Sequence, residues 1–157
     1  MERRIYIIID NIRSKQNVGS IFRTADALRV SKIYLCGTTP CPLDRFGREV
    51  GEISKTALGA EKNIKWEYSK TTNSVINKLK KDGVKIVAIE QAKNSVDYKK
   101  VKIKDNVAFV LGNEVNGINK NTLKLCDVVA EIPMKGGKES LNVSVACGVA
   151  LFRILNI

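Results

Sequence analysis

Three stretches of the sequence place glycine beside polar or charged side chains, a combination suited to binding a small ligand. They are residues 17–24 (NVGSIFRT), 111–117 (LGNEVNG) and 132–152 (IPMKGGKESLNVSVACGVALF). In the third stretch a proline, two adjacent glycines and two lysines precede an almost entirely apolar run. This order predicts a polar loop that leads into a broadly buried helix. Backbone N–H groups of such a loop are available to hold a ligand.

The second stretch has some features of a phosphate-binding loop but lacks the essential ones. Gly112 and Gly117 have the Walker spacing, but Ile118 and Asn119 occupy the places of the lysine and the Ser/Thr. Taken alone, this stretch is more often an ordinary turn between a strand and a helix. Arg23 in the first stretch lies off the apolar side of its predicted helix, and a lone helical arginine is usually a solvated surface residue.

The residue types that are missing exclude several kinds of chemistry. The chain has no histidine, which rules out Ser-His-Asp and Cys-His catalysis. Proton transfer must therefore use a carboxylate, lysine, arginine, tyrosine, thiol or water. A zinc site would need all four scattered cysteines, Cys36, Cys41, Cys126 and Cys147. We therefore predict no metal site, and reduced, mostly buried cysteines.

Charge and length narrow the class of protein. A formal charge of +11 over 157 residues favours a polyanionic partner, although a merely solubilising surface is an equal alternative. Apolar runs are too short to span a bilayer or to form a signal peptide. We predict a single domain, residues 1–157, that is soluble and cytoplasmic and binds no membrane.

The spacing of apolar residues predicts strands that alternate with helices. Strands are expected at 5–9, 33–36, 63–68, 84–89, 107–111 and 127–132, and helices at 18–28, 52–60, 71–81, 119–126 and from residue 141 onward. Asn17 is a plausible N-cap, and 37–51 should be mostly loop. Residues 98–104 are either an exposed edge strand protected by charge or a surface patch that follows the phosphate backbone of a polyanion. The alternation indicates an α/β fold with a mainly parallel sheet flanked by helices.

In this order and at these spacings, the three stretches resemble the motifs of the SpoU family of tRNA/rRNA 2′-O-ribose methyltransferases, in the SPOUT class. The resemblance covers most of the chain and is to the catalytic domain alone. It implies a deep C-terminal trefoil knot, at about residues 107–157, and S-adenosylmethionine as cofactor. It also implies an RNA substrate and a homodimer, whose active sites lie beside an interface that we expect to form through the C-terminal helix.

The resemblance also implies which residues form the site. The knotted cofactor pocket would be formed by Leu111, Gly112, Asn113, Glu114, Gly117, Ile132, Met134, Ser140 and Leu141. The catalytic set would be Asn17, Arg23, Glu114, Ser140 and Asn142. Family mechanisms make the arginine the base, but a guanidinium stays protonated in proteins. We prefer a role for Arg23 in clamping a phosphate and stabilising oxyanion charge, with water or Glu114 as proton acceptor.

Expected contacts to RNA are Arg23, Arg45, Arg48, Lys135 and Lys138. Two alternatives stay open: a non-catalytic RNA-binding protein that retains the fold, and a knotted methyltransferase that acts on a base nitrogen. The Asn-to-Arg spacing of the first stretch and the Ser-Leu-Asn of the third favour ribose. The sequence leaves open whether the target is tRNA or rRNA, which nucleotide is modified, and whether a partner protein takes part.

Overall fold

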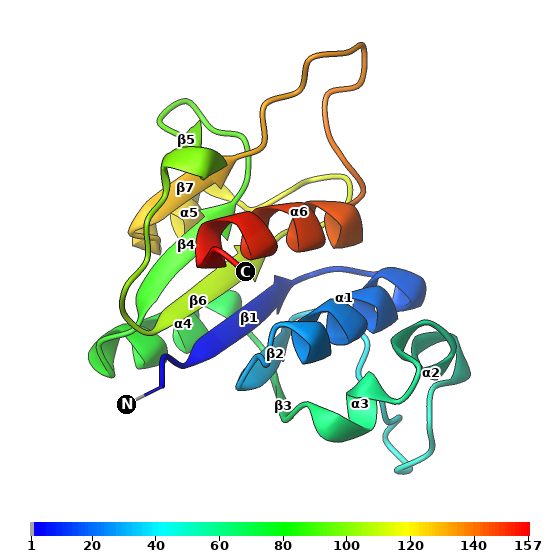
Figure 1. The fold of residues 1–157 in the computed structure, drawn as a ribbon. Helices are drawn as coiled ribbons and strands as arrows, with labels where there is room; N and C mark the ends of the chain where they lie inside the picture. Colours follow the sequence, from blue (N-terminus) through cyan, green and yellow to red (C-terminus); the bar gives the residue numbers. More distant parts are fainter. Residues whose placement is uncertain (1) are drawn as a thin grey trace.

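A computed structural model describes residues 2–157 and shows a seven-stranded sheet in the order β3-β2-β1-β6-β4-β7-β5 (Figure 1). Every neighbouring pair of strands runs parallel. The strands are β1 (Ile5–Asp10), β2 (Lys32–Cys36), β3 (Trp66–Ser69), β4 (Lys85–Ile89), β5 (Val96–Asp97), β6 (Val107–Leu111) and β7 (Val128–Glu131). The predicted α/β class with a mainly parallel sheet is confirmed. The C-terminal knot stays a prediction.

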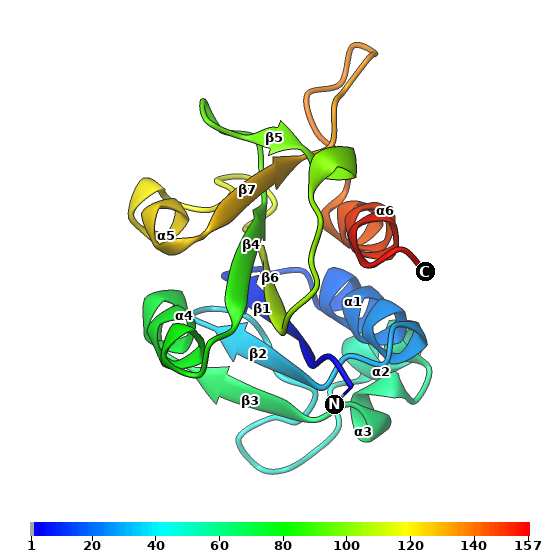
Figure 2. The ribbon, with the colours of Figure 1, turned by 60° about the vertical axis from the view of Figure 1, so that its left-hand side comes forward.

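Helices cover both faces of the sheet, as Figure 2 shows. One face carries α1 (Lys15–Ala27), α2 (Gly51–Ala57), α3 (Ala60–Asn63) and α6 (Val143–Leu155), and the other carries α4 (Thr72–Lys81) and α5 (Lys120–Leu125). Because helices lie on both sides, the central strands β1 and β6 are buried on both faces. This explains why their sequences, IYIIID and VAFVL, read as nearly continuous apolar runs instead of alternating ones.

The first helix begins earlier than the sequence predicts. Its N-cap is Ser14, whose Oγ accepts a hydrogen bond from the backbone N–H of Asn17 at 3.2 Å, so Asn17 lies inside the first turn. The error arises because the first turn, Lys-Gln-Asn, is polar and adds nothing to the apolar periodicity. Gly19 allows α1 to lie against α2, because a Cβ there would come within 3.1 Å of the backbone nitrogen of Ala57.

The predicted helix over 52–60 ends early, at Ala57 in α2, and a second short helix, α3, occupies Ala60–Asn63, although a strand was predicted to begin at residue 63. Leu58 and Gly59 separate them, and both have left-handed backbone conformations, with φ of 53° and 92°. Glycine adopts such a conformation without steric cost, which permits the break.

Residues 98–104 do not form the predicted edge strand. Tyr98–Lys100 is a short 3₁₀ helix (η1), and the residues after it are extended but unpaired with the sheet. The alternation of lysine with apolar residues arises because Val101 and Ile103 are buried in the core. Arg3 donates from Nη1 to the carbonyl of Ile103 at 2.8 Å and fixes this segment. The alternative role as a patch that contacts RNA stays a prediction.

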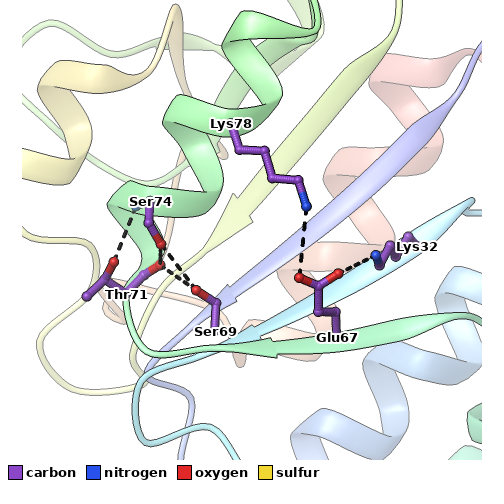
Figure 3. Close-up of polar contacts among 6 residues, drawn as sticks. All are labelled: Lys32, Glu67, Ser69, Thr71, Ser74 and Lys78. Carbon is purple, nitrogen blue, oxygen red and sulfur yellow. Dashed lines mark hydrogen bonds and ion pairs between the residues drawn. The ribbon is translucent and has the colours of Figure 1, made fainter.

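Charged side chains protect the outer strand β3. Glu67 accepts a hydrogen bond from Lys32, and Lys78 from α4 lies 3.9 Å away on its other side (Figure 3). We call Lys32, Glu67 and Lys78 the edge cluster. Beside it, the N-cap Thr71 of α4 accepts a hydrogen bond from the backbone N–H of Ser74 at 3.3 Å. Such charges on an edge strand oppose pairing with another chain.

The remaining predictions concern the membrane and the cysteines. Within residues 2–157, no helix is long and apolar enough to cross a membrane. All four cysteines have free thiols, of which Cys36 and Cys147 are buried. Burial raises the pKa of the Cys147 thiol to about 12, so this cysteine packs as an apolar residue.

Candidate functional site

A cavity of about 400 Å³ opens where the carboxyl ends of β4, β6 and β7 meet the start of α6. Ligands in open parallel sheets typically bind at this edge, and the volume falls in the range of small-molecule sites. The wall consists of Ile89, Glu90, Gln91, Gly112, Asn113, Glu114, Val115, Asn116, Gly117, Ile132, Met134, Glu139, Ser140, Leu141, Asn142, Val143 and Ala146. Two separate loops, 111–118 and 132–142, therefore face one another across it.

All the residues predicted for cofactor binding line this cavity, except Leu111. The Leu111 side chain is only 1% exposed and packs in the core at the end of β6. The sequence motif includes Leu111 because it adjoins Gly112, but its side chain supports the sheet and does not face the cavity.

The loop after β6 is fixed by the side chain of Asn113. Its Nδ2 donates to the carbonyl of Asn11 at 2.7 Å, and its Oδ1 accepts from the backbone N–H groups of Val115 and Asn116 at 2.9 and 3.0 Å. Gly112 is required by close packing, since a Cβ there would lie 2.7 Å from the carbonyl carbon of Gly117 and 2.8 Å from the nitrogen of Ile118. The loop is therefore held in one shape by its own polar groups.

Glu90 and Gln91, which follow β4, form part of the site and were not predicted. Glu90 accepts a hydrogen bond from the backbone N–H of Ile118 at 3.0 Å, while Gln91 donates from Nε2 to the carbonyl of Glu139 at 2.6 Å. These two residues connect both loops to the same strand end. The available signal was their position after a buried strand, but using it requires knowing that β4 lies between β6 and β7.

A chain of polar contacts lies at one side of the cavity. The carboxylate of Glu114 accepts from the backbone N–H of Ser14 at 3.0 Å, from that of Arg13 at 3.2 Å and from Nδ2 of Asn17 at 3.4 Å. Asn142 donates from its Nδ2 to Oδ1 of Asn17 at 3.1 Å. We call Arg13, Ser14, Asn17, Glu114 and Asn142 the pocket cluster. It joins the predicted residues Asn17, Glu114 and Asn142 across three distant parts of the chain.

The pocket cluster also fixes two helix starts. Asn142 is the N-cap of α6, and its Oδ1 accepts from the backbone N–H of Ser144 at 2.9 Å. Figure 1 shows α1 and α6 side by side with their first turns on the same side of the molecule. Glu114 therefore lies at the N-terminus of α1, where the helix dipole favours negative charge.

The pKa of Glu114 follows from these partners. Partial burial acts to raise it, but the hydrogen bonds from Ser14, from Arg13, from the backbone N–H of Glu114 itself and from Asn17 outweigh burial and lower the pKa below its ordinary value of 4.5. Within residues 2–157, no lysine or arginine nitrogen forms an ion pair with this carboxylate. Glu114 is thus an anion held by neutral donors.

The other predicted site residues lie around this centre. Ser140 lines the cavity, and Lys135 and Lys138 are exposed on the same loop between β7 and α6. Arg45 and Arg48 are exposed on the loop between β2 and α2. Arg23 is exposed on α1 and does not line the cavity; in the described part of the chain its guanidinium has neither a hydrogen bond nor an ion pair. The single chain thus leaves Arg23 apart from the other catalytic candidates.

Helix α6 is covered on one side only. Its residues Cys147, Ala150, Leu151, Ile154 and Leu155 are buried. Leu141, just before the helix, and Val145 and Val149, one and two turns further, are 37%, 50% and 39% exposed. These three residues, which we call the α6 stripe, form an apolar row beside the cavity.

Comparison with known proteins gives consistent matches over almost the whole chain. The model of the SpoU rRNA methylase family matches residues 4–152. The chain is 31% identical over 150 residues to the 23S rRNA (guanosine-2′-O-)-methyltransferase RlmB of Coxiella burnetii. The aligned region covers 96% of this chain and 57% of that protein. The chain is 29% identical over 155 residues to the tRNA (guanosine(18)-2′-O)-methyltransferase of Aquifex aeolicus, covering 96% of this chain and 68% of that one.

A solved structure agrees with the sequence matches. The AdoMet-bound rRNA methyltransferase from Sinorhizobium meliloti superposes with a TM-score of 0.87 at 31% identity, over 99% of this chain and 57% of that one. The chain therefore spans little more than half the length of the RlmB protein and of this solved structure.

Proposed function

Because the chain belongs to the SpoU rRNA methylase family, we propose that it transfers a methyl group from S-adenosylmethionine to a ribose 2′-hydroxyl of tRNA or rRNA. One observation carries this proposal: the predicted cofactor residues other than Leu111 line a single cavity, with the pocket cluster at its side. The names of the relatives, which modify rRNA or tRNA at guanosine 2′-O, support it. A protein with this activity would work where RNA is, and we propose a cytoplasmic location.

The cavity suits S-adenosylmethionine by shape and charge. Ile89, Ile132 and Leu141 provide apolar surface for the flat adenine ring. Glu90, Glu114 and Glu139 place carboxylates around the same space, which suits a positively charged sulfonium and an ammonium group. When bound there, the cofactor would supply an electrophilic methyl group.

We assign Glu114 the role of a fixed anion that positions Asn17 and the start of α1. Its carboxylate already accepts hydrogen bonds from Ser14, Arg13 and Asn17, and its lowered pKa makes it a weak base. Of the two proton acceptors considered above, this favours water over Glu114. Arg23 would clamp a substrate phosphate and stabilise the charge that develops on the ribose oxygen, since a guanidinium can bind two oxygens at once.

We further propose that the protein forms a homodimer through α6. The α6 stripe exposes Leu141, Val145 and Val149 in one row beside the cavity, and helix α1, which carries Arg23, packs against α6. A dimer across this row would bring Arg23 close to an active site. Val145→Asp should convert the dimer to a monomer in sedimentation, whereas Val96→Asp, at a similarly exposed valine on β5, should not.

Cofactor binding is tested by titration calorimetry with S-adenosylmethionine. Wild-type protein should bind it, and Gly112→Ala should bind at least ten-fold more weakly, because the new methyl group displaces the backbone of Gly117 and Ile118. Gly136→Ala is the matched control, since nothing lies within 4 Å of a Cβ at that position. Thermal unfolding of both variants confirms that they are folded. Absence of binding by the folded wild type would contradict the proposal.

Nucleoside analysis of RNA from cells that lack the gene tests the reaction itself. The proposal predicts loss of one 2′-O-methylnucleoside. Loss of a methylated base would instead indicate methyl transfer to a base nitrogen. An unchanged profile would favour a non-catalytic RNA-binding protein.

A further inference from the structure

Phe46, at the tip of the loop between β2 and α2, is 66% exposed. This loop extends beyond α2 and α3 in Figure 1 and leaves the sheet at the carboxyl end of β2. The carboxyl ends of β4, β6 and β7, at the same edge of the parallel sheet, carry the cavity. Single exposed apolar side chains are common on protein surfaces, so exposure alone does not mark a binding site, and the groups around the ring decide its role.

Two cations accompany the ring. The guanidinium carbons of Arg45 and Arg48 each lie 4.9 Å from the centre of the Phe46 ring, within the range of cation–π contacts. Arg48 also pairs with Asp44, so two guanidinium groups and one carboxylate leave a net positive charge beside the ring, which suits a polyanion.

The loop is held in shape by Asp44. Its Oδ1 accepts from the backbone N–H groups of Phe46 and Arg48 at 2.8 and 3.0 Å, and its Oδ2 accepts from Nε of Arg48 at 2.9 Å. Backbone bonds from Asp44 to Arg48 at 2.8 Å and from Gly47 to Asp44 at 3.0 Å close the turn. Ring and guanidinium groups are thus presented together before any partner arrives, which lowers the entropic cost of binding.

We propose that Phe46 is a stacking platform for an unpaired base of the RNA substrate, and that Arg45 and Arg48 hold the phosphates beside that base. Exposed aromatic rings next to arginines recognise single-stranded RNA in this way, because every base has a flat face. The assignment rests on the proposed RNA methyl transfer. It adds a preference for a single-stranded or looped segment of RNA over a continuous duplex.

The experiment measures RNA binding without turnover, so it does not depend on finding the modified nucleotide. The probe is a fluorescent single-stranded oligoribonucleotide of mixed sequence, about 12 nucleotides long, compared with a duplex of the same length. Phe46→Ala and Phe46→Leu should each weaken single-strand binding roughly five-fold to hundred-fold, and Phe46→Trp should retain it. Duplex binding should change little in all three variants.

Leu58→Ala is the matched control, because Leu58 is also 66% exposed but has no aromatic ring. This variant should bind both probes as the wild type does. Unchanged single-strand binding by Phe46→Ala would overturn the assignment, as would full binding by Phe46→Leu. Absence of single-strand binding by the wild type, or loss of self-association in Phe46→Ala with RNA affinity intact, would also overturn it. If Phe46→Ala weakens RNA binding while the wild type transfers no methyl group, the platform stands and the proposed reaction fails.

Discussion

Glu67 on β3 and Glu114 in the loop after β6 are both hydrogen-bonded carboxylates, but their partners differ in charge. Glu67 lies between Lys32 and Lys78, so its negative charge is balanced by cations (Figure 3). Glu114 is held by N–H groups of Ser14, Arg13 and Asn17, which carry no net charge. The pKa of both carboxyls is lowered, chiefly by Lys32 for Glu67 and by neutral donors acting against burial for Glu114.

We propose that this difference separates a structural carboxylate, Glu67, from a functional one, Glu114. A cation beside a carboxylate balances its negative charge, so the carboxylate attracts a charged ligand only weakly, as at Glu67. Neutral donors fix the position of Glu114, which lines the cavity, without cancelling its negative charge. The exposed Arg23, Lys135 and Lys138 likewise have no ion pair within residues 2–157, so both signs of charge stay available around the pocket.

The largest effect is expected from Arg23→Lys. The lysine keeps the charge but cannot bind two oxygens at once, so methyl transfer should fall by at least about 100-fold. Cofactor binding should be unchanged, since Arg23 does not line the cavity. Radiometric methyl transfer and calorimetry measure the two quantities. Arg29→Lys, the same change at another exposed arginine, is the control, and near-full activity of Arg23→Lys would refute the clamp.

Glu114→Gln should reduce methyl transfer about ten- to hundred-fold, because the amide turns an N–H group toward the backbone donors and removes the negative charge. Glu67→Gln should leave the rate unchanged. It should lower the free energy of unfolding by only about 0.2–1 kcal/mol, the range of exposed ion pairs. Initial rates and chemical denaturation of the two variants provide the comparison. Equal losses of activity would show that the two carboxylates do not differ in role.

The N-caps Ser14 and Thr71, which lie beside these two carboxylates, should also differ in their effect on activity. Ser14→Ala at α1 and Thr71→Ala at α4 each remove a side-chain acceptor, at a cost of about 0.5–2 kcal/mol. Ser14→Ala alone should also slow methyl transfer several-fold, because Ser14 and Asn17 begin the helix that contacts Glu114. Thermal unfolding and initial rates test this pair. A rate loss in Thr71→Ala of the same size would mean that the effect follows from stability alone.

The smallest effects are those of pH. Both carboxyl groups have a pKa in the folded protein below the ordinary value of 4.5. The activity or stability that depends on the ionised carboxylate is therefore fully present above this value and is lost only as the pH falls through the lowered pKa. The ratio of wild-type to Glu114→Gln rates should therefore be constant between about pH 6 and pH 8. A ratio that rises with pH across this range would mean that Glu114 takes up its charge there, which would contradict a lowered pKa for this carboxyl. The stability difference of Glu67→Gln should shrink only in acid.

The sequence was sufficient to predict the helices and strands whose apolar residues follow the pattern of burial. β6 was predicted at its observed bounds because all five of its residues are buried, and the helix predicted at 119–126 is α5, Lys120–Leu125. Prediction failed where polar contacts decide the structure. The start of α1 depends on the hydroxyl of Ser14, and the break after α2 depends on the backbone of Leu58 and Gly59, neither of which the apolar spacing reflects.

The candidate site was likewise predicted only in part. Its loops were predicted from residue type, and the resemblance to the SpoU family singled out Gly112, Glu114 and Asn142 within them. Glu90 and Gln91 were missed because their place beside β6 comes from strand order, a long-range property with no local signal. The apolar side of α1 indicated that Arg23 is exposed, but the position of the cavity relative to α1 depends on the order of the strands, which the sequence does not show.

The most direct test of the central claim is to locate the methyl group that the purified protein transfers. RNA from cells lacking the gene would be incubated with the protein and S-adenosylmethionine carrying a labelled methyl group, then digested with alkali. Alkaline cleavage needs a free 2′-hydroxyl, so label on a ribose 2′-oxygen should remain in alkali-stable dinucleotides and be much reduced with Glu114→Gln. Label in mononucleotides, or no label from a protein that binds the cofactor, would contradict the account.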